Sequence, residues 1–291
     1  MAERTLGVIG GSGLYELPGL EAMEHTRVRT PFGDPSDDVV VGRLGSTRLL
    51  FLPRHGRGHR LLPSELPFRA NIWALKSLGA DCLLAVSAVG SLREEIAPGH
   101  VVIPDQFIDR TRGRQSESTF FGRGVVAHVQ FADPFCAPLS SALAAAARAA
   151  GATAHVGGTY VCMEGPAFST RAESNLYRSW GAHVIGMTNL QEAKLAREAE
   201  LCFATLALAT DYDCWHAGHD DVQIEAVLAV LAANVTLARR TVAALVPRLP
   251  APFPSTSCPC PRALENAIIT DRALIPADVR RDLAPIAGRY L

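Results

Sequence analysis

The chain has 291 residues, of which 48% are hydrophobic, so it can bury a sizeable core. Its 28 Lys and Arg nearly balance 29 Asp and Glu, which disfavours binding to nucleic acid or to an anionic membrane. No stretch reaches the roughly 18 apolar residues of a membrane span, and the N-terminus does not resemble a signal peptide. We therefore expect a soluble, cytoplasmic protein.

Short runs of β-branched and apolar residues alternate with helix-length segments, a pattern typical of a sheet covered by helices on both faces. The segments Val39–Arg43 and Thr47–Leu52 flank Leu44-Gly45-Ser46, which predicts a hairpin and hence a mixed sheet. We expect a single-domain α/β fold with strands at Leu6–Ile9, Val39–Arg43, Thr47–Leu52, Cys82–Val86, Val101–Ile103, Thr159–Met163, His183–Ile185 and Leu201–Ala209.

Helices are predicted from their end signals. Thr170 with Glu173, and Asn189 with Glu192, have the spacing of a side-chain cap and a reaching carboxylate. An Ala-rich segment, Ala137–Ala150, stops at Gly151, and Val222–Leu245 repeats apolar residues at helical spacing.

From about Pro247 the chain becomes rich in Pro and Ser and ends in two short helical segments. We expect residues 1–246 to form the main domain and residues 247–291 an extension that packs on it or on a neighbouring subunit. The seven cysteines mostly lie in apolar stretches, as small buried hydrophobes do. Cys258-Pro259-Cys260 is an exception: its spacing is too tight for a zinc ribbon, and a disulfide would need an oxidising or hyperthermophilic setting.

Two motifs near the N-terminus suit an anion. The segment from Gly10 to Gly13 follows a buried strand, and Ser12 adds a hydroxyl to its backbone N–H groups. It lacks the third glycine of a dinucleotide fingerprint. The segment PRHGRGHR, residues 53–60, also follows a strand, and its Arg54 and His55 suit an oxyanion. An unoccupied turn and a solvated basic loop are the alternatives.

Three further strand ends carry small or polar residues. Ser87 and Ala88 lie in a turn of small side chains that leaves room for phosphate. Thr188 offers a hydroxyl at the start of a helix, and Phe168 could stack on a planar base just before another helix. Each feature alone also fits an ordinary strand end or a core residue.

Asp211 and Asp213 are the most informative residues. They follow a long apolar strand, and residues two apart in an extended chain point the same way. Two carboxyl groups can supply the proton donor at N7 and the acceptor at the 6-amino group that an adenine edge needs. Metal ligation is the alternative, but a third ligand at suitable spacing is found only in the His216 and His219 loop.

Together the motifs resemble the methylthioadenosine phosphorylase branch of the purine nucleoside phosphorylases. The resemblance runs from about Leu6 to Leu245 and rests on GVIGGSGLYE, TPFGDPSD, PRHGRGHR, RANIWALKSLGA, VSAVGSLREEI, PDQFIDRT, MEGPAFSTRAES, GMTNLQEAKLARE and ATDYDCW. Many long motifs in one order are far more specific than any single turn. The chain departs from many relatives at Ala167, where they have Arg, and at Gln191, where they have Pro.

The resemblance implies phosphorolysis of 5′-methylthioadenosine to adenine and 5-methylthioribose 1-phosphate. It implies phosphate binding by Ser12, Arg54, His55, Ser87, Ala88 and Thr188. It assigns the nucleoside to Phe168, Ser169, Met187, Asp211, Asp213, Ile224, Val227 and, from an adjacent subunit, His128. Asp211 would be the catalytic acid, and burial together with the neighbouring Asp213 would raise its pKa.

The implied assembly is a homotrimer or a dimer of trimers, with inorganic phosphate as co-substrate and with neither metal nor organic cofactor. Two alternatives stay open: a phosphorylase for 6-oxopurine nucleosides or methylthioinosine, and a non-catalytic nucleoside-binding protein. A third, an NAD-dependent dehydrogenase, is disfavoured by the incomplete glycine motif. The 6-oxopurine relatives carry Glu where Ser169 stands and Asn where Asp211 stands. Fold alone does not separate an enzyme from a binding protein.

Overall fold

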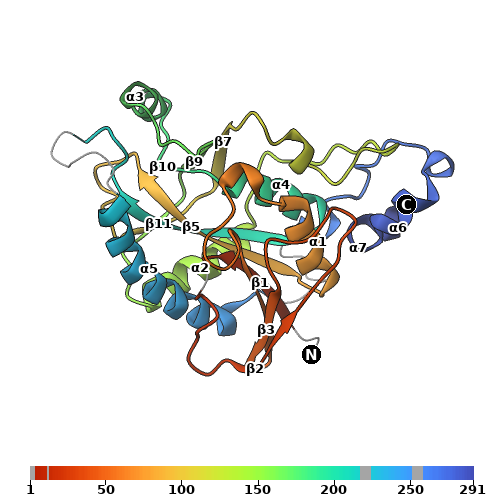
Figure 1. The fold of residues 1–291 in the computed structure, drawn as a ribbon, viewed down its shortest axis with the longest axis horizontal. Helices are drawn as coiled ribbons and strands as arrows, with labels where there is room; N and C mark the ends of the chain where they lie inside the picture. The colour runs from red at the N-terminus through yellow and green to blue at the C-terminus, as the bar shows by residue number, and fades with distance from the viewer. Residues whose placement is uncertain (1–3, 12, 217–223, 251–257) are drawn as a thin grey trace.

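The computed structural model describes residues 4–11, 13–216, 224–250 and 258–291. A mixed sheet of 11 strands forms the middle layer, with the order β2-β3-β4-β1-β5-β10-β9-β7, while β11 pairs with β5 and β6, and β6 with β8 (Figure 1). The strands are β1 (Arg4–Gly10), β2 (Glu21–Thr26), β3 (Val39–Leu44), β4 (Thr47–Pro53), β5 (Cys82–Ser91), β6 (Val101–Ile103), β7 (Gln106–Arg110), β8 (Ala154–Val156), β9 (Thr159–Met163), β10 (Val184–Gly186) and β11 (Cys202–Asp211). This confirms the predicted fold class.

The hairpin prediction is confirmed, since β3 and β4 pair antiparallel across a turn in which Gly45 has φ 59°. Strands β2, β7 and β8 were not predicted. All but one of the side chains of β2 are exposed, so its sequence EAMEHT carries no apolar pattern. Pairing with neighbouring strands, rather than local sequence, defines such short strands.

Alternation along the central strands separates two cores. In β1, Leu6 and Val8 face one core and Ile9 faces the other, because successive side chains of a strand point to opposite faces. Helices α1 (Phe68–Ser77) and α4 (Asn189–Glu198) cover the face of Ile9. On the other face lie α2 (Ala137–Ala149) and α5 (Ile224–Leu245).

Helix α3 (Arg171–Ser179) starts as predicted: the Thr170 hydroxyl accepts from Glu173 N at 3.2 Å, and Glu173 Oε2 accepts from Thr170 N at 2.8 Å. The cap predicted for Asn189 is wrong. Thr188 is the N-cap of α4 and makes no side-chain cap bond, while Asn189 Oδ1 accepts from Thr205 Oγ1 at 2.7 Å and Glu192 binds Arg54. The helix at Ala137–Ala150 is confirmed, as is the one at Val222–Leu245 from Ile224 on; residues 222 and 223 are not described.

The C-terminal segment ends in α6 (Ala277–Asp282) and α7 (Ala284–Ala287), in keeping with the two short helices predicted there. Both lie beside α1 (Figure 1), where Trp73 Nε1 donates to Asp282 O at 2.9 Å. Ile286 and Ala287 join the same core as Ile72 of α1. The segment therefore shares a core with the sheet.

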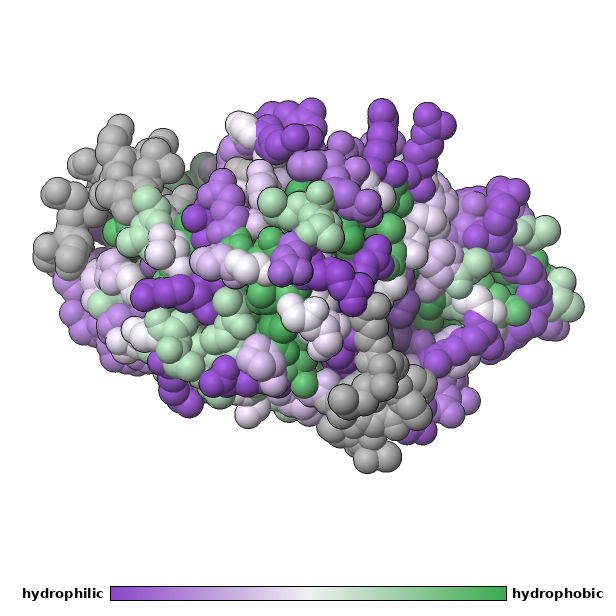
Figure 2. Space-filling view, turned by 90° about the horizontal axis from the view of Figure 1, so that it is seen from below, coloured by the Kyte–Doolittle hydropathy of each residue, from purple (hydrophilic) through white to green (hydrophobic). Residues whose placement is uncertain are grey.

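On the face seen in Figure 2, hydrophilic side chains separate smaller hydrophobic patches. Among the described residues, no helix is both long and apolar enough to span a membrane.

Candidate active site

Four parallel strands, β4, β1, β5 and β11, bring their carboxyl ends to one edge of the sheet. Gly10 of β1 pairs with Pro53 of β4, so the glycine-rich turn and the basic loop begin side by side. On the far side of β5, Asp211 pairs with Gly90. Ligands of open α/β sheets bind at this edge, and most of the predicted site residues lie along it.

Arg54 crosses the strand ends from the end of β4. Only 4% of it is exposed, and its guanidinium donates to both carboxylate oxygens of Glu192, at 2.6 Å from Nε and 3.0 Å from Nη2. Nη1 donates to Val86 O at 2.8 Å and Nη2 to Ile9 O at 3.3 Å. A guanidinium has five N–H groups, so these bonds leave one donor on Nη1 for a ligand.

His55 is mostly buried next to Arg54, and its Nδ1 lies 2.8 Å from Leu61 O. A carbonyl oxygen only accepts, so Nδ1 carries the hydrogen and Nε2 presents a lone pair. Burial lowers the pKa of His55 to about 4, so the ring is neutral at pH 7. His55 therefore offers an acceptor rather than a positive charge.

The rest of the basic loop points elsewhere. Arg57 is paired with Asp37 at 3.1 Å, and Arg60 donates to Ser36 O at 3.2 Å. Asp37, Ser36 and Arg60 border a hollow of about 530 Å³ that is also lined by Asp34 and Glu65, and Asp211 is not among its lining residues. Of the five basic or imidazole side chains in the motif, Arg54 and His55 are the two that turn inward.

Ser87 and Ala88 lie in β5 just beyond Val86, whose carbonyl binds Arg54. Ser87 is 5% exposed and its Oγ lies 3.3 Å from Tyr160 Oη, whereas Ala88 is exposed. Strand β10 runs antiparallel to β5, with Ile185 opposite Gly90, so the chain leaving β10 returns toward Ala88. Continued in the same register, the chain after β10 carries the buried Thr188 toward Ser87.

Gly186 makes this close approach possible. A side chain there would lie 1.9 Å from Tyr160 Oη, which is the hydroxyl beside Ser87. Gly165, with φ 68°, has a similar role next to Met187, because a Cβ there would lie 2.5 Å from the Met187 sulfur. Because the backbone at Gly186 lies so close to Tyr160, and the backbone at Gly165 so close to Met187, a side chain would not fit at either position and glycine is required.

Asp211 and Asp213 lie together at the end of β11. Asp211 Oδ1 accepts from Asp213 N at 2.7 Å, and its Oδ2 accepts from Thr210 Oγ1 at 2.7 Å. The first bond holds Asp213 in the left-handed region, at φ 52°, which is unusual for a residue with a side chain. Asp213 Oδ2 is buried without a hydrogen-bond partner among the described residues, so it is an acceptor available to a ligand.

Burial raises the pKa of both carboxyl groups. For Asp211 the bonds from Thr210 and from the Asp213 backbone oppose this rise in pKa. The pKa of Asp213 is raised by burial, lowered by the hydroxyl of Ser174 and raised again by the charge of Asp211. The pKa of Asp211 is thus raised by burial, as predicted. Asp213 was expected to raise it further, but its backbone N–H donates to Asp211 and lowers that pKa instead.

The predicted base-stacking residue, Phe168, is 51% exposed on the loop before α3. Ser169 follows it, and its carbonyl accepts from Cys214 Sγ at 3.3 Å, next to Asp213. Arg114, which is buried, donates to the carbonyls of Met187 and Glu164 and pairs with the Glu164 carboxylate at 3.1 Å. This arginine therefore ties the loop before α3 to the loop before α4.

Four predicted residues are not brought to this edge by the described structure. Ser12 lies outside the described residues, although Arg239 of α5 fixes the adjacent turn by donating to Gly13 O at 2.8 Å. Ile224 and Val227 fall in the first turns of α5, but the structure does not describe their side chains. His128 is exposed, and its N–H donates to Ala267 O at 2.9 Å in the C-terminal segment. The neighbouring residues pair with the same segment, since Ala127 bridges to Ile268 and Ile269 N donates to Val126 O at 2.9 Å.

Sequence reasoning missed Glu192, Arg114 and Tyr160. Glu192 was expected to cap its own helix, and its true partner, Arg54, is 138 positions away. Arg114 and Glu192 stand out because each is a charged residue that the fold buries, and such residues need a partner. Their burial is visible only in the structure, so the sequence offers no local signal for them.

A family profile described as the phosphorylase superfamily matches residues 5–247. The chain belongs to this family. The S-methyl-5′-thioadenosine phosphorylase of Geobacter sulfurreducens is 60% identical over 289 residues, covering 99% of this chain and 100% of that protein. The protein of the same name from Chloroflexus aurantiacus is 58% identical over 290 residues, covering 100% of this chain and 99% of that protein.

Solved structures agree. A methylthioadenosine phosphorylase from an Antarctic soil metagenomic library has a TM-score of 0.91 at 44% identity, covering 98% of this chain and 99% of that one. The methylthioadenosine phosphorylase of Schistosoma mansoni in complex with adenine has a TM-score of 0.82 at 35% identity, covering 91% of this chain and 99% of that one. The predicted membership in the methylthioadenosine phosphorylase branch is confirmed.

Proposed function

We propose that this enzyme uses inorganic phosphate to split 5′-methylthioadenosine into adenine and 5-methylthioribose 1-phosphate. The observation that carries the proposal is the division of one sheet edge into two sites. At one part of it Arg54 donates to Val86 O beside Ser87, and at the other Asp211 and Asp213 lie together at the end of β11. The names and full-length similarity of the relatives support the same reaction.

Phosphate would lie over Ser87 and Ala88, with the free Nη1 donor of Arg54 and the hydroxyl of Thr188 as partners. His55 Nε2 can accept the remaining hydrogen of a monoprotonated phosphate, which fits a neutral ring whose Nε2 keeps a lone pair. Ser12 would add a hydroxyl from the glycine-rich turn. Charge-assisted donors hold an anion and fix its direction of attack.

The purine would lie at Asp211 and Asp213, with Phe168 and Ser169 along its face and edge. Asp213 Oδ2 is a buried acceptor without a partner among the described residues, so it suits a hydrogen of the 6-amino group. Asp211, with its raised pKa, would give a proton to N7. Met187 would lie against the ribose, and Ile224 and Val227 beside the methylthio group.

In the reaction a phosphate oxygen bonds to C1′ while the bond from C1′ to N9 breaks and adenine leaves with the proton at N7. An oxocarbenium-like transition state is expected by analogy with glycoside hydrolysis. The negative phosphate beneath C1′ stabilises the positive charge that develops there. We propose phosphate as co-substrate, without an organic cofactor, and a place in purine and methionine salvage in the cytoplasm.

A 6-oxopurine substrate is disfavoured because it would set an oxygen against Asp213 Oδ2, with an acceptor facing an acceptor. Such a mismatch costs about 1–3 kcal/mol, or roughly tenfold to a hundredfold in kcat/KM. Comparing methylthioadenosine with methylthioinosine under saturating phosphate tests this point, and equal kcat/KM values would overturn the proposed role of Asp213.

We also propose that the enzyme is a homotrimer, alone or as a dimer of trimers, in which His128 completes the 5′ side of a neighbour's site. The exposure of His128, on a segment whose N–H pairs with the C-terminal segment rather than with the residues around Asp211, supports this arrangement. The main unit would be residues 1–246, and residues 247–291 would be an extension that supports the segment containing His128.

Subunit mixing tests the shared site. We expect His128→Ala and Asp211→Asn each to lower activity alone, whereas co-refolded mixtures regain part of it, because some interfaces then combine an intact His128 with an intact Asp211. A mixture of Asp211→Asn with Asp213→Asn is the control, since both changes lie in one subunit's site. Absence of recovery in the His128 mixture, or full activity of a monomer in sedimentation, would contradict the proposal.

A further inference from the structure

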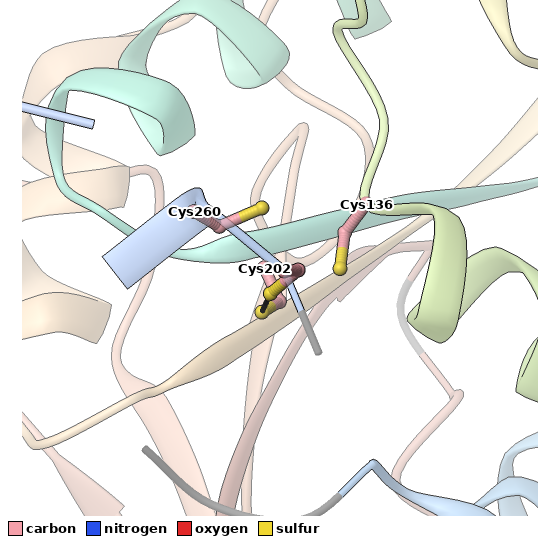
Figure 3. A group of neighbouring side chains, drawn as sticks. Cys136, Cys202 and Cys260 are labelled. Carbon is pink, nitrogen blue, oxygen red and sulfur yellow. Dashed lines mark hydrogen bonds between the residues drawn. The ribbon is translucent and has the colours of Figure 1, made fainter. Parts of the chain in front are cut away.

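Four cysteines from distant parts of the chain meet at the amino-terminal ends of the strands, opposite the candidate active site. Cys136 is the N-cap of α2, Cys202 begins β11, and Cys258 and Cys260 enter from the C-terminal segment. Figure 3 shows Cys136, Cys202 and Cys260 converging from three different elements. Their four sulfur atoms all lie within 4.8 Å of one another, and three of the four residues are buried.

The spacing of the sulfurs fits a shared ion. A tetrahedral metal with sulfur ligands at about 2.3 Å holds neighbouring sulfurs about 3.8 Å apart. Cys202 Sγ and Cys258 Sγ are 3.5 Å apart, and all four sulfurs lie within 4.8 Å of one another, so small side-chain adjustments suffice. All seven cysteines are free thiols in this structure.

The surroundings also suit a thiolate-bound ion. The positive charge of Arg197 acts on Cys260, and it would offset part of the negative charge that four thiolates gather around a divalent ion. Cys260 and Cys136 lie in the hydrophobic core beneath α2 and α5, which shields the site from water. Among the described residues, this is the one group of His, Cys, Asp or Glu side chains close enough to hold a metal ion.

We propose that Cys136, Cys202, Cys258 and Cys260 form a structural metal site of the zinc type. Four thiolates in a tetrahedron select Zn²⁺, and binding releases the thiol protons to solvent. The one-residue spacing of Cys258 and Cys260 does not match a zinc ribbon, but here the other two ligands come from β11 and the start of α2. The ion would fasten the C-terminal segment to the sheet.

This site is independent of the proposed reaction. Its effect is on the segment that continues from Cys260 to Ala267 and Ile268, which pairs with Ala127 and His128. Removing the ion should therefore loosen the support of the His128 segment first. We expect chelation of the full-length enzyme under reducing conditions to lower Tm by about 5 °C or more, because a ligand that binds only the folded state stabilises it.

Elemental analysis of the full-length enzyme, purified with reductant and without chelator, tests the proposal. We expect about one zinc per chain, a loss of most of it in Cys260→Ser and in the milder variant Cys258→Ser, and its retention in Cys162→Ser. Cys162 is a buried cysteine of β9 outside the group, so it controls for the loss of a core thiol. Replacing zinc with Co²⁺ should give the visible absorption of tetrahedral cobalt thiolate in the wild type and in Cys162→Ser.

Three results would overturn the proposal. One is a reduced, folded wild type that contains no metal and binds neither Zn²⁺ nor Co²⁺. Another is zinc that remains at wild-type level in Cys202→Ser/Cys260→Ser, which would place it elsewhere. The third is thiol counting by mass spectrometry that finds these four cysteines joined as disulfides in enzyme isolated from the cytoplasm under non-reducing conditions.

Discussion

Asp211→Asn should lower kcat/KM for methylthioadenosine about a hundredfold or more, because an amide cannot transfer a proton to N7 of the leaving adenine. The fold should survive, because the amide oxygen can accept from Asp213 N in place of Oδ1, and the amide nitrogen in place of Oδ2 can donate to the Thr210 hydroxyl, which can also accept. The preference for adenine over hypoxanthine nucleosides should shrink as well, because the amide can donate to N7 or to O6.

The measurement is steady-state kinetics on methylthioadenosine and methylthioinosine at saturating phosphate. Ser169→Glu added to Asp211→Asn should shift the preference further toward the 6-oxopurine nucleoside, as the relatives with that pair of residues suggest. Asp37→Asn, on the far side of the basic loop, is a matched control that should leave both kcat/KM values near those of the wild type. If Asp211→Asn keeps near-normal turnover, the acid is Asp213 or water.

Arg54→Ala should weaken the use of phosphate by about a hundredfold to a thousandfold, because a charged donor beside the nucleophile is lost. Adenine affinity should change much less, because Asp211 and Asp213 remain. The same change leaves Glu192 buried without its partner, which costs about 3–5 kcal/mol of stability. Two effects are thus expected from one substitution, and they can be separated.

The double variant Arg54→Ala/Glu192→Gln separates them. Neutralising Glu192 should recover part of the stability in urea unfolding, while the kcat/KM for phosphate stays low. If phosphate use recovers together with stability, Arg54 only supports the fold. If adenine affinity falls as far as phosphate affinity in either variant, Arg54 does not belong to the phosphate half of the site.

Local signals in the sequence predicted the β3–β4 hairpin and the α3 cap, because Gly45 and the Thr170 to Glu173 spacing act within a few residues. Asp211 and Asp213 do lie together, but the predicted reason, an extended chain, is wrong: Asp213 has φ 52° and its N–H donates to Asp211 Oδ1. The recruitment of Glu192 by Arg54 was not predicted, because it depends on burial of both side chains by elements far apart in the sequence. The four-cysteine group likewise joins positions 136 to 260, which no spacing rule connects.

Edge strands show the other limit. Among the described strands, β2 pairs with β3 alone, and its side chains are mostly exposed, so neither face imposes an apolar pattern on its sequence. The predicted roles of Ser12, Ile224, Val227 and His128 rest on the resemblance, and a neighbouring subunit is needed to judge the last of them.

The central claim is that the chain carries out phosphorolysis rather than binding or hydrolysis of a nucleoside. Adenine release from methylthioadenosine, followed with and without phosphate, tests it most directly. We expect release that depends on phosphate and yields one 5-methylthioribose 1-phosphate for each adenine. Adenine released equally well without phosphate, with free methylthioribose as the product, would contradict the account, and so would binding without any release.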